Sequence, residues 1–349
     1  MAHRLPYVAL GVLPTPVERL LHLGHDQLWI KREDLSSPRH GGNKVRKLEF
    51  TLADAMRRGH RTVVTMGGLG TNHGLATAIF CRQLGLRACL ALYDQPITPH
   101  VLQTLLRLQG AGAALHRYRT LLGAGVALQT VERLRNPGAY ILASGGSSPM
   151  GTIGVVNAMF ELREQVDAGL MPAPDVIFTA LGSSGTMAGL SLGALLAGLT
   201  TRVIGVRVTM DHAGPVPIAN RGTVRALMRR TLALLRRYAP EVPAVEIPAQ
   251  LVIDAQVGAG YGHGTAAGAA AAEIMMQRER LALDPTYTAK TFAAVRDYIG
   301  NAAHRRDVVL YWHTFFDMVN VVPPIDMGYR TLPRAFHAIF EQAIEPADG

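Results

Sequence analysis

A glycine turn ahead of a lysine is the first place in this chain where the residue types could do chemistry. The turn reads Gly41-Gly42-Asn43-Lys44, and a helix is predicted to begin near Lys44. Glycines let the backbone approach a ligand closely, and a lysine amine forms a Schiff base when its surroundings lower its pKa. A lysine at a helix start also opposes the helix dipole, which is a mild indication of function. On these local features alone, a surface lysine after a turn is the stronger interpretation.

A second glycine-rich turn follows the apolar strand Val176–Ala180 and opens a helix of small residues. It consists of Gly182, Ser183, Ser184, Gly185 and Thr186. Backbone N–H groups, hydroxyls and a helix N-terminus together suit a phosphate. The turn is no Walker motif, because no lysine follows Gly185. An ordinary strand-to-helix turn with a Ser or Thr cap is an equally good interpretation.

A third turn, Gly67–His73, also lies between a predicted strand and a predicted helix. Its residues Thr71, Asn72 and His73 could seat a carboxylate or a ring oxygen. The alternative is structural: Thr71 or Asn72 caps the helix, and His73 is a packed or solvated histidine.

A fourth glycine-rich segment, Gly258–Gly264, carries Tyr261 at its centre and precedes an alanine-rich helix. It weakly resembles a dinucleotide-binding loop, but the glycine spacing departs from the full fingerprint. A tyrosine supported by glycines and projecting into a cleft explains the segment equally well.

Metal and hydrolase motifs are missing from the sequence. The histidines are scattered, and neither HExxH nor a cysteine pair at ligand spacing occurs, so we expect no metal site. A GxSxG nucleophile elbow is likewise absent. Cys81 and Cys89 lie among largely apolar residues and are predicted to be buried free thiols rather than a disulfide.

The elements that must position these turns alternate between strand and helix, which predicts an α/β protein with mostly parallel sheets. The 349 residues, 48% of them apolar, suit two domains that share a cleft. The predicted strands are Gln27–Lys31, Arg61–Met66, Arg87–Tyr93, Ala139–Ala143, Asp175–Ala180, Arg202–Val208 and Asp307–Trp312, and the predicted helices are Lys44–Arg58, Asn72–Leu84, Val101–Leu108, Leu121–Arg135, Thr152–Val166, Thr186–Leu196, Val224–Tyr238, Ala266–Gln277 and Ala289–Ile299.

The net charge of +9 invites a nucleic-acid interpretation, which the pattern does not favour. The densest basic run, Arg221–Arg237, has its arginines among apolar residues at helical spacing, which is typical of a solvated helix face. We therefore expect no nucleic-acid partner. The sequence shows neither a leader pattern nor an apolar run near the roughly 20 residues of a membrane span. A soluble cytoplasmic protein without a membrane partner is the expectation.

Taken together and in order, the motifs resemble the D-cysteine desulfhydrase and 1-aminocyclopropane-1-carboxylate deaminase family. That family belongs to the tryptophan-synthase-like fold type of pyridoxal-phosphate enzymes. The matching segments cover most of the chain and are Ile30–Leu35, Gly41–Glu49, Thr71-Asn72-His73, Gly145-Gly146-Ser147-Ser148, Gly182–Thr186, Gly260-Tyr261-Gly262, Leu283–Thr288 and His313-Thr314.

The resemblance implies a fold and a quaternary structure. Two Rossmann-like domains with twisted, mostly parallel sheets would hold pyridoxal 5'-phosphate in the cleft between them. The large domain would comprise residues 1–49 and 161–349, and a small inserted α/β domain residues 50–160. A homodimer is also implied.

The resemblance implies roles for the motif residues. Lys44 would bind the cofactor carbonyl and then take the substrate α-proton. The cofactor would further contact Lys47, Asn72, the Gly182–Thr186 turn and Thr314. The substrate side would be lined by Thr71, Asn72, His73, Ser147, Tyr261 and Tyr287. The two tyrosines would also be catalytic, handling protonation of the leaving group or carbanion.

Several positions depart from the family pattern. Thr288 stands where ring-opening members carry Glu, which argues against a cyclopropane substrate. Thr71 replaces the usual Ser and Leu75 the usual Arg, while Ser184 replaces a glycine in the phosphate turn. Phe315 and Phe316 replace two glycines after Thr314, so space near the cofactor ring must be filled differently.

The first hypothesis is a lyase that eliminates the β-substituent of a small amino acid such as D-cysteine or cysteate, giving an α-keto acid and ammonia. A β-replacement enzyme or a specialised biosynthetic member of the same fold is the alternative. A nicotinamide-dependent oxidoreductase built on the Gly258–Gly264 loop is a second class. A binding protein that has lost the chemistry is a third, which the Phe315-Phe316 change keeps open.

Overall fold

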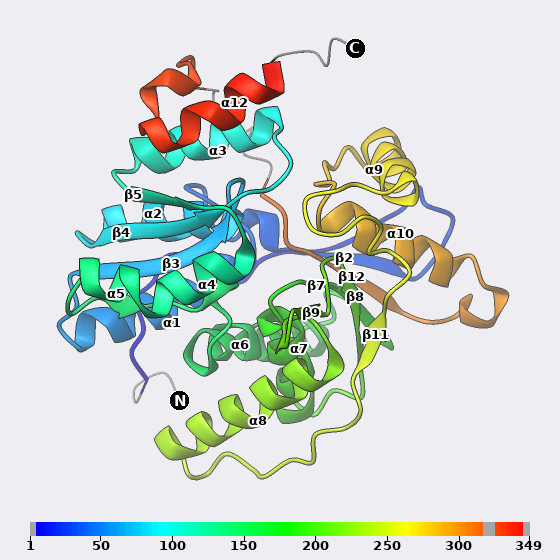
Figure 1. The fold of residues 1–349 in the computed structure, drawn as a ribbon. Coiled ribbons are helices and arrows are strands. Elements are labelled where there is room, and N and C mark those ends of the chain that lie inside the picture. Colours follow the sequence, from blue (N-terminus) through cyan, green and yellow to red (C-terminus); the bar gives the residue numbers. More distant parts are fainter. Residues whose placement is uncertain (1–4, 317–324, 345–349) are drawn as a thin grey trace. The chain divides into compact units, whose positions relative to one another are not determined.

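The computed structural model describes residues 5–316 and 325–344, which fall into two compact units (Figure 1). The first unit comprises Met1–Thr51 and Ser147–Asp317, and the second comprises Leu52–Gly146 and Met318–Gly349. Helix α1 (Lys44–Arg57) begins in the first unit and ends in the second. Each unit has its own sheet and its own core.

The first unit is built on a six-stranded sheet in the order β1-β2-β12-β7-β8-β11. Only the β1–β2 pair is antiparallel, and the four other pairs are parallel. The strands are β1 (Val17–Arg19), β2 (Leu28–Arg32), β7 (Val176–Leu181), β8 (Arg202–Arg207), β11 (Leu251–Ile253) and β12 (Val309–His313). A separate antiparallel pair consists of β9 (His212–Ala213) and β10 (Val216–Pro217).

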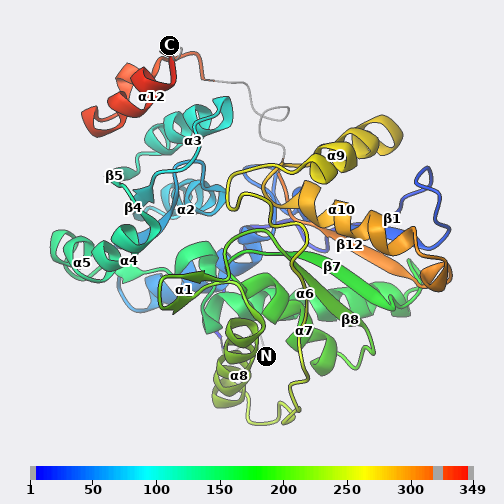
Figure 2. The same ribbon diagram turned by 45° about the vertical axis from the view of Figure 1, so that its right-hand side comes forward.

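Both faces of this sheet are buried, which explains why its central strands are mostly apolar. Along β12, Val309 and Tyr311 belong to one core cluster, while Leu310 and Trp312 belong to the other. Because side chains alternate across a strand, each face supplies its own core. One face packs against α6 (Pro149–Asp167), α7 (Gly185–Leu196) and α8 (Arg221–Tyr238), and the other against α9 (Ala266–Glu279) and α10 (Thr288–Ile299) (Figure 2).

The second unit contains a four-stranded, fully parallel sheet in the order β5-β4-β3-β6. Its strands are β3 (Thr62–Gly68), β4 (Arg87–Tyr93), β5 (Ala114–Tyr118) and β6 (Tyr140–Ile141), and its helices are α2 (Asn72–Gln83), α3 (Pro99–Gly110), α4 (Leu121–Gln129), α5 (Val131–Arg135) and α12 (His337–Ile344). The C-terminal residues join this unit through side-chain bonds such as that from Arg117 to the carbonyl of Ala335.

Three details differ from the sequence-based expectations. Helix α6 belongs wholly to the first unit, because it packs against α7 in that unit's core, so the inserted segment of the second unit stops at Gly146, whereas the expected small domain extended to residue 160. The single helix expected over Leu121–Arg135 is broken at Thr130, whose φ of −119° and ψ of −87° are not helical. Strand β5 was not predicted at all.

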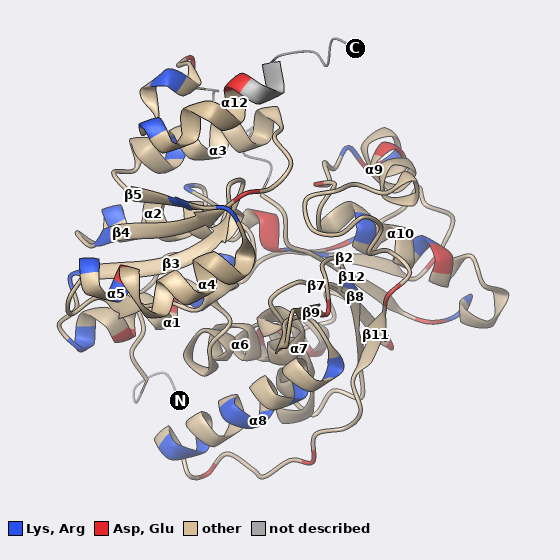
Figure 3. Ribbon diagram, in the orientation of Figure 1, with Lys and Arg blue, Asp and Glu red and all other residues tan. Residues whose placement is uncertain are grey.

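The basic run on α8 is a solvated helix face, as predicted. Val224, Leu227 and Leu235 are buried, whereas the arginines between them are exposed (Figure 3). Within the part of the chain that the structure describes, no helix combines the length and apolarity needed to cross a bilayer.

Candidate functional site

The candidate site of the first unit lies at the carboxyl ends of three neighbouring parallel strands. β12 lies between β2 and β7. The turn Gly182–Thr186 follows β7, Thr314 follows β12, and the chain after β2 leads to the Gly41–Lys44 turn. In open α/β sheets this edge is where ligands bind. The topology therefore brings together motifs that are far apart in the sequence.

A buried ionic network holds the start of α1 in place. The guanidinium of Arg46 donates to the carboxylate of Glu33 at 2.8 Å and to that of Glu161 at 2.8 Å and 2.9 Å. Lys31 donates to Glu161 at 2.6 Å and to the carbonyl of Thr15 at 2.7 Å. Because three charged side chains of this network are almost fully buried, each depends on its partners for compensation. The network fixes the helix that carries Lys44 and Lys47.

Lys44 is the accessible lysine of the chain. The sequence has four lysines, all within the described residues, and Lys31, Lys47 and Lys290 are at most 1% exposed. Desolvation lowers the pKa of Lys44 to about 8, although the nearby charge of Asp284 acts to raise it. A larger share of this amine is therefore neutral near neutral pH than for an ordinary lysine, as a nucleophile requires.

Asn43 connects Lys44 to the turn after β7. Its Oδ1 accepts a hydrogen bond from Lys44 Nζ at 2.8 Å, and its Nδ2 donates to Thr186 Oγ1 at 2.7 Å. One amide thus aligns the lysine with the N-terminus of α7, which orients both groups toward the same ligand position.

Hydrogen-bond donors gather at the N-terminus of α7. Ser147 Oγ lies 3.5 Å from Lys47 Nζ and 2.8 Å from Ser183 Oγ, and it accepts from the N–H of Gly185 at 3.1 Å. A β-carbon on Gly185 would clash with Ser147 and come within 2.9 Å of Lys47 Nζ, so only glycine fits there. Desolvation, followed by repulsion from Lys44, lowers the pKa of Lys47 well below its usual value. An anion bound here would relieve both effects.

Ser184 contributes to the turn differently from the expectation that its side chain binds the cofactor. Its φ of +68° is left-handed, a conformation that favours glycine. Its hydroxyl lies 3.1 Å from the carbonyl of Ile218 and 2.8 Å from Thr223 Oγ1. The side chain therefore ties the turn to the start of α8, and a contact of Ser184 with the cofactor stays a prediction.

Tyr261 and Tyr287 meet through their hydroxyls, although the sequence separates them by 26 residues. Tyr287 donates to Tyr261 at 2.9 Å, and their rings pack edge to face at 5.9 Å. The ring of Tyr287 also lies 3.3 Å from the position of a β-carbon on Gly182, which sets it against the turn after β7. Burial raises the pKa of Tyr261, so its hydroxyl keeps its proton.

Two residues without an assigned role position this tyrosine pair. Asp284 accepts from the N–H groups of Thr286, Tyr287 and Thr288, and so fixes the turn that begins α10. Lys290 donates to the carbonyls of Val257 at 2.8 Å and Gly260 at 3.1 Å, which holds the loop next to Tyr261.

Sequence reasoning missed the roles of Arg46, Asp284 and Lys290. A signal existed for Lys290, because it is a lone charge within the otherwise uncharged run Thr288–Val295 of a predicted helix. The partners of Arg46 come from strands and helices remote in the sequence, so no spacing rule could have identified them.

The residues after β12 pack directly on the glycine turn before Lys44. A β-carbon on Gly42 would lie 2.6 Å from the carbonyl oxygen of Thr314, and one on Gly41 would lie 2.9 Å from the ring of Phe316. The Phe316 ring also lies 5.4 Å from the ring of the buried His40. Phe316 therefore fills the space beside the turn. Glycine is required at position 41 chiefly because a β-carbon there would lie 1.9 Å from the carbonyl oxygen of Asp34.

Thr71, Asn72 and His73 lie in the second unit. The Thr71 hydroxyl caps α2 by accepting from the N–H of Gly74 at 3.1 Å, which is the structural alternative named above. His73 is buried, with its ring 3.0 Å from the hydroxyl of Thr65, so the structure favours a packing role over the predicted substrate contact. The expected convergence of Asn72 with Lys44 stays a prediction, because the two residues belong to different units.

Comparison with known proteins gives one family for nearly the whole chain. The family model described as "Pyridoxal-phosphate dependent enzyme" matches residues 8–314. D-Cysteine desulfhydrase of Klebsiella pneumoniae is 31% identical over 327 residues, covering 89% of this chain and 94% of that protein. A Pyrococcus abyssi protein, provisionally named a 1-aminocyclopropane-1-carboxylate deaminase, is 31% identical over 318 residues, with 89% and 92% coverage.

Solved structures agree with this result. The crystal structure of a homologue of 1-aminocyclopropane-1-carboxylate deaminase matches with a TM-score of 0.74 and 28% identity, covering 89% of this chain and 92% of that one. O-Ureido-L-serine synthase matches with a TM-score of 0.60 over 86% and 88%, and at 16% identity it shows the fold alone.

Proposed function

Because the chain belongs to the pyridoxal-phosphate-dependent enzymes, in the family of 1-aminocyclopropane-1-carboxylate deaminases and D-cysteine desulfhydrases, we propose that it is a lyase that removes the β-substituent of a small amino acid. The products would be an α-keto acid and ammonia. The cofactor of the family is pyridoxal phosphate. This membership overturns the alternative of a nicotinamide-dependent oxidoreductase built on the Gly258–Gly264 loop.

The donor cluster at α7 fits the phosphate of this cofactor. It combines an ammonium, hydroxyls and an N–H group at a helix N-terminus, which is the donor set that a dianion prefers. Gly185 keeps the space beside Lys47 and Ser147 clear of a side chain. Lys47, Ser147, Ser183 and the Gly185 backbone would hold the phosphate, and Lys44 would bind the carbonyl carbon.

Pyridoxal phosphate, when bound, supplies an electrophilic carbonyl and an electron sink for the α-carbon of an amino acid. Lys44 then has two duties at one atom, Nζ. It would hold the cofactor covalently, and once released its neutral amine would accept the substrate α-proton. A pKa near 8 suits both duties, since an efficient general base has a pKa near the working pH.

Tyr261 and Tyr287 would move a proton at the β-substituent. Tyr261 accepts from Tyr287 and keeps its own proton because burial raises its pKa. It can therefore act as a general acid toward a departing thiolate or sulfite-like group, while Tyr287 stabilises the phenolate that results. Asp284 and Lys290 hold the two tyrosines in this pair.

Elimination is favoured over ring opening at this site. Thr288 stands where ring-opening members carry Glu, and its hydroxyl donates to Asp284 Oδ2 at 2.7 Å, so it stabilises the turn instead of titrating. The relative from Klebsiella pneumoniae bears the name of a D-cysteine desulfhydrase. A small amino acid with a sulfur-containing β-substituent is therefore the substrate class that we propose.

The observation that carries the proposal is the accessible amine of Lys44, with its lowered pKa, next to the α7 donor cluster. In Lys44→Ala we expect loss of the visible absorbance of lysine-bound cofactor and loss of pyruvate release from D-cysteine, cysteate or β-chloroalanine. Arg39→Ala, an exposed residue ahead of the same turn, should keep both.

Borohydride reduction followed by peptide mapping identifies the labelled lysine directly. Label on any lysine other than Lys44 would refute the cofactor assignment. Label on Lys44 without pyruvate from any of the three substrates would keep the cofactor site and replace elimination by β-replacement chemistry.

A further inference from the structure

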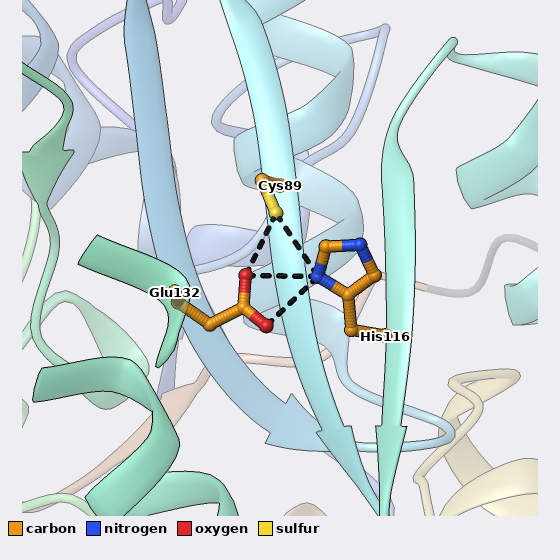
Figure 4. A group of neighbouring side chains, drawn as sticks. All are labelled: Cys89, His116 and Glu132. Atoms are coloured by element: carbon orange, nitrogen blue, oxygen red, sulfur yellow. Dashed lines mark hydrogen bonds and ion pairs between the residues drawn. The ribbon is translucent and has the colours of Figure 1, made fainter. Parts of the chain in front are cut away.

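Three side chains with metal-binding atoms converge in the second unit, on elements that carry no residue of the candidate site. They are Cys89 on β4, His116 on β5 and Glu132 on α5 (Figure 4). Across the described residues this is where a thiol, an imidazole and a carboxylate come together. The sequence suggested no metal site, because 43 residues separate Cys89 from Glu132 and no spacing motif links them.

The fold produces the cluster through two features that the sequence did not predict. Ala91 pairs with His116 across β4 and β5, so Cys89, two residues before Ala91, lies on the same face of the sheet as His116. The break at Thr130 separates α4 from α5, and α5 carries Glu132. The carboxylate of Glu132 then lies 2.8 Å from His116 Nδ1.

The distances among the ligand atoms resemble the edges of a zinc tetrahedron. Cys89 Sγ lies 3.6 Å from His116 Nδ1 and 3.4 Å from Glu132 Oε2. Zinc bonds of about 2.3 Å to sulfur and about 2.0–2.2 Å to nitrogen and oxygen give edges of about 3.4–3.6 Å at tetrahedral angles. The two edges at sulfur therefore fit directly. The distance from His116 Nδ1 to the carboxylate of Glu132 must increase by about half an ångström. A small rotation of the imidazole achieves this, because the His116 side chain is 31% exposed.

The surroundings support a bound cation. Cys89 and Glu132 are buried at 2% and 0% exposure, whereas the partly exposed ring of His116 leaves a path for an ion and a water as fourth ligand. Tyr118 donates to Glu132 Oε1 at 2.5 Å, and Asn136 donates to Cys89 Sγ at 3.7 Å. Such outer partners orient ligands in metal sites.

We propose that Cys89, His116 and Glu132 form a site for a zinc-like divalent cation, with water in the fourth position. A thiol, an imidazole and a carboxylate together prefer Zn²⁺ over Mg²⁺ or Ca²⁺, which favour oxygen ligands. Binding ties α5 to the edge of the sheet. The thiol of Cys89 loses its proton to solvent and becomes the thiolate ligand, while His116 binds through Nδ1 with its proton on Nε2.

Without a metal the same three residues form a hydrogen-bonded network, which is the competing explanation.

Cobalt substitution separates these explanations. Untagged, full-length protein with its cofactor bound is titrated with Co²⁺, and absorption at wavelengths beyond the cofactor band reports tetrahedral cobalt. We expect this band in the wild type and its loss in Cys89→Ser, and excess Zn²⁺ should displace it. Cys81→Ser is the matched control, because Cys81 is also buried but lies on α2 outside the cluster.

His116→Gln is the second variant, because its partly exposed side chain can change without opening the core. We expect its Zn²⁺ dissociation constant, measured by calorimetry, to rise at least about 100-fold, since even residues that merely orient a ligand are worth about 10–100-fold. A circular dichroism spectrum and a thermal unfolding midpoint like those of the wild type show that the variant is folded. No cobalt band in the wild type, or an equal band in folded Cys89→Ser, would overturn the proposal.

Discussion

Arg46 holds the carboxylate of Glu33 through both Nε and Nη2 at 2.8 Å, with both side chains almost fully buried. Arg46 lies two residues after Lys44 and one before Lys47, so this ion pair sets the position of the two lysines assigned to the cofactor. A β-carbon on Gly154 would clash with the carbonyl oxygen of Arg46, which shows how closely α6 approaches the same turn of α1. The buried ion pair of Arg46 and the close packing of α6 thus hold this turn of α1 in position.

Arg46→Met should destabilise the protein severely. It leaves the buried carboxylate of Glu33 without its charged partner, whereas the partly exposed Glu161 keeps its pair with Lys31. Breaking a buried pair costs about 3–5 kcal/mol. The free energy of urea unfolding measures this loss. Arg57→Met on the same helix removes an exposed guanidinium from Asp54, which keeps Arg58 and Tyr140 as partners, and should cost about 1 kcal/mol or less. Similar losses of unfolding free energy in the two variants would show that the buried network stabilises the protein no more than the pair at Arg57.

Lys44 should react with pyridoxal phosphate in a pH-dependent way set by its pKa of about 8. Only the neutral amine attacks, so the rate in cofactor-free protein should rise about tenfold per pH unit below 8 and level off above it. An ordinary lysine would keep gaining rate up to its usual pKa of 10.5. Stopped-flow absorbance measures the rate. A profile that still rises steeply above pH 9 would contradict the lowered pKa.

Tyr287→Phe should reduce kcat while leaving cofactor absorbance intact. The change removes the hydroxyl that donates to Tyr261, and loss of a positioned acid or its partner costs about 10²–10⁴-fold. Pyruvate release under saturating substrate gives kcat. Tyr298→Phe on the same helix, whose hydroxyl bonds Asp307 instead, is the control and should retain full activity. Equal kcat values in the two variants would exclude the tyrosine pair from the chemistry.

Lys290→Met should act through Tyr261 as the loss of a positioning residue. Without its hydrogen bonds to the carbonyls of Val257 and Gly260, the loop is free to shift, and a displacement of about 1 Å costs about 100-fold in rate. We expect kcat to fall with cofactor absorbance unchanged, and Lys290→Arg to restore part of it. Arg278→Met, on the exposed side of α9, controls for loss of charge. A purely structural lysine would instead lower cofactor content and kcat together.

Ser184 gives an unusual order of stability among its variants. Ser184→Ala loses the contacts with Ile218 and Thr223 but keeps the left-handed backbone, so we expect a loss of about 1–3 kcal/mol. Ser184→Gly loses the same contacts but removes about 1–2 kcal/mol of backbone strain, and should be nearly neutral. Thermal unfolding of the two variants checks the order. If Ser184→Ala unfolded at a higher temperature than Ser184→Gly, the inferred backbone strain at this position would be wrong.

The strand and helix pattern of the sequence predicted most of the first unit correctly, because its buried parallel strands are uninterrupted apolar runs. The same pattern failed at β5, whose sequence Ala-Leu-His-Arg-Tyr has mixed polarity, because this strand lies at a sheet edge and is only partly buried. It also missed the break at Thr130, where helix-forming residues lie on both sides. Edges and breaks are decided by tertiary packing rather than by local preference.

The residues of the candidate site also divide into those with a local sequence pattern and those whose roles depend on tertiary contacts. The turns before Lys44 and at Gly182–Thr186 were noticed as glycine turns at helix starts, a local pattern that also fitted structural interpretations. Only the family resemblance assigned Lys44 and Lys47 to the cofactor, and it gave Ser147 to the substrate side. Arg46 and Asp284 were not recognised, because their roles depend on partners that only the folded chain supplies. The motif at Thr71–His73 predicted a turn correctly, but whether its side chains cap, pack or bind depends on contacts that spacing alone does not specify.

The burial of Lys31, Lys47 and Lys290 has a practical consequence for work with this protein. An acylating dye reacts with amines and does not modify the arginines that supply the surface cations of this protein. Lys31, Lys47 and Lys290 are buried, so the accessible side-chain amine belongs to Lys44. Cofactor attached to that amine would protect it. The fraction of molecules that take up label at Lys44, read by mass spectrometry, would then count the molecules in a preparation that have lost their cofactor.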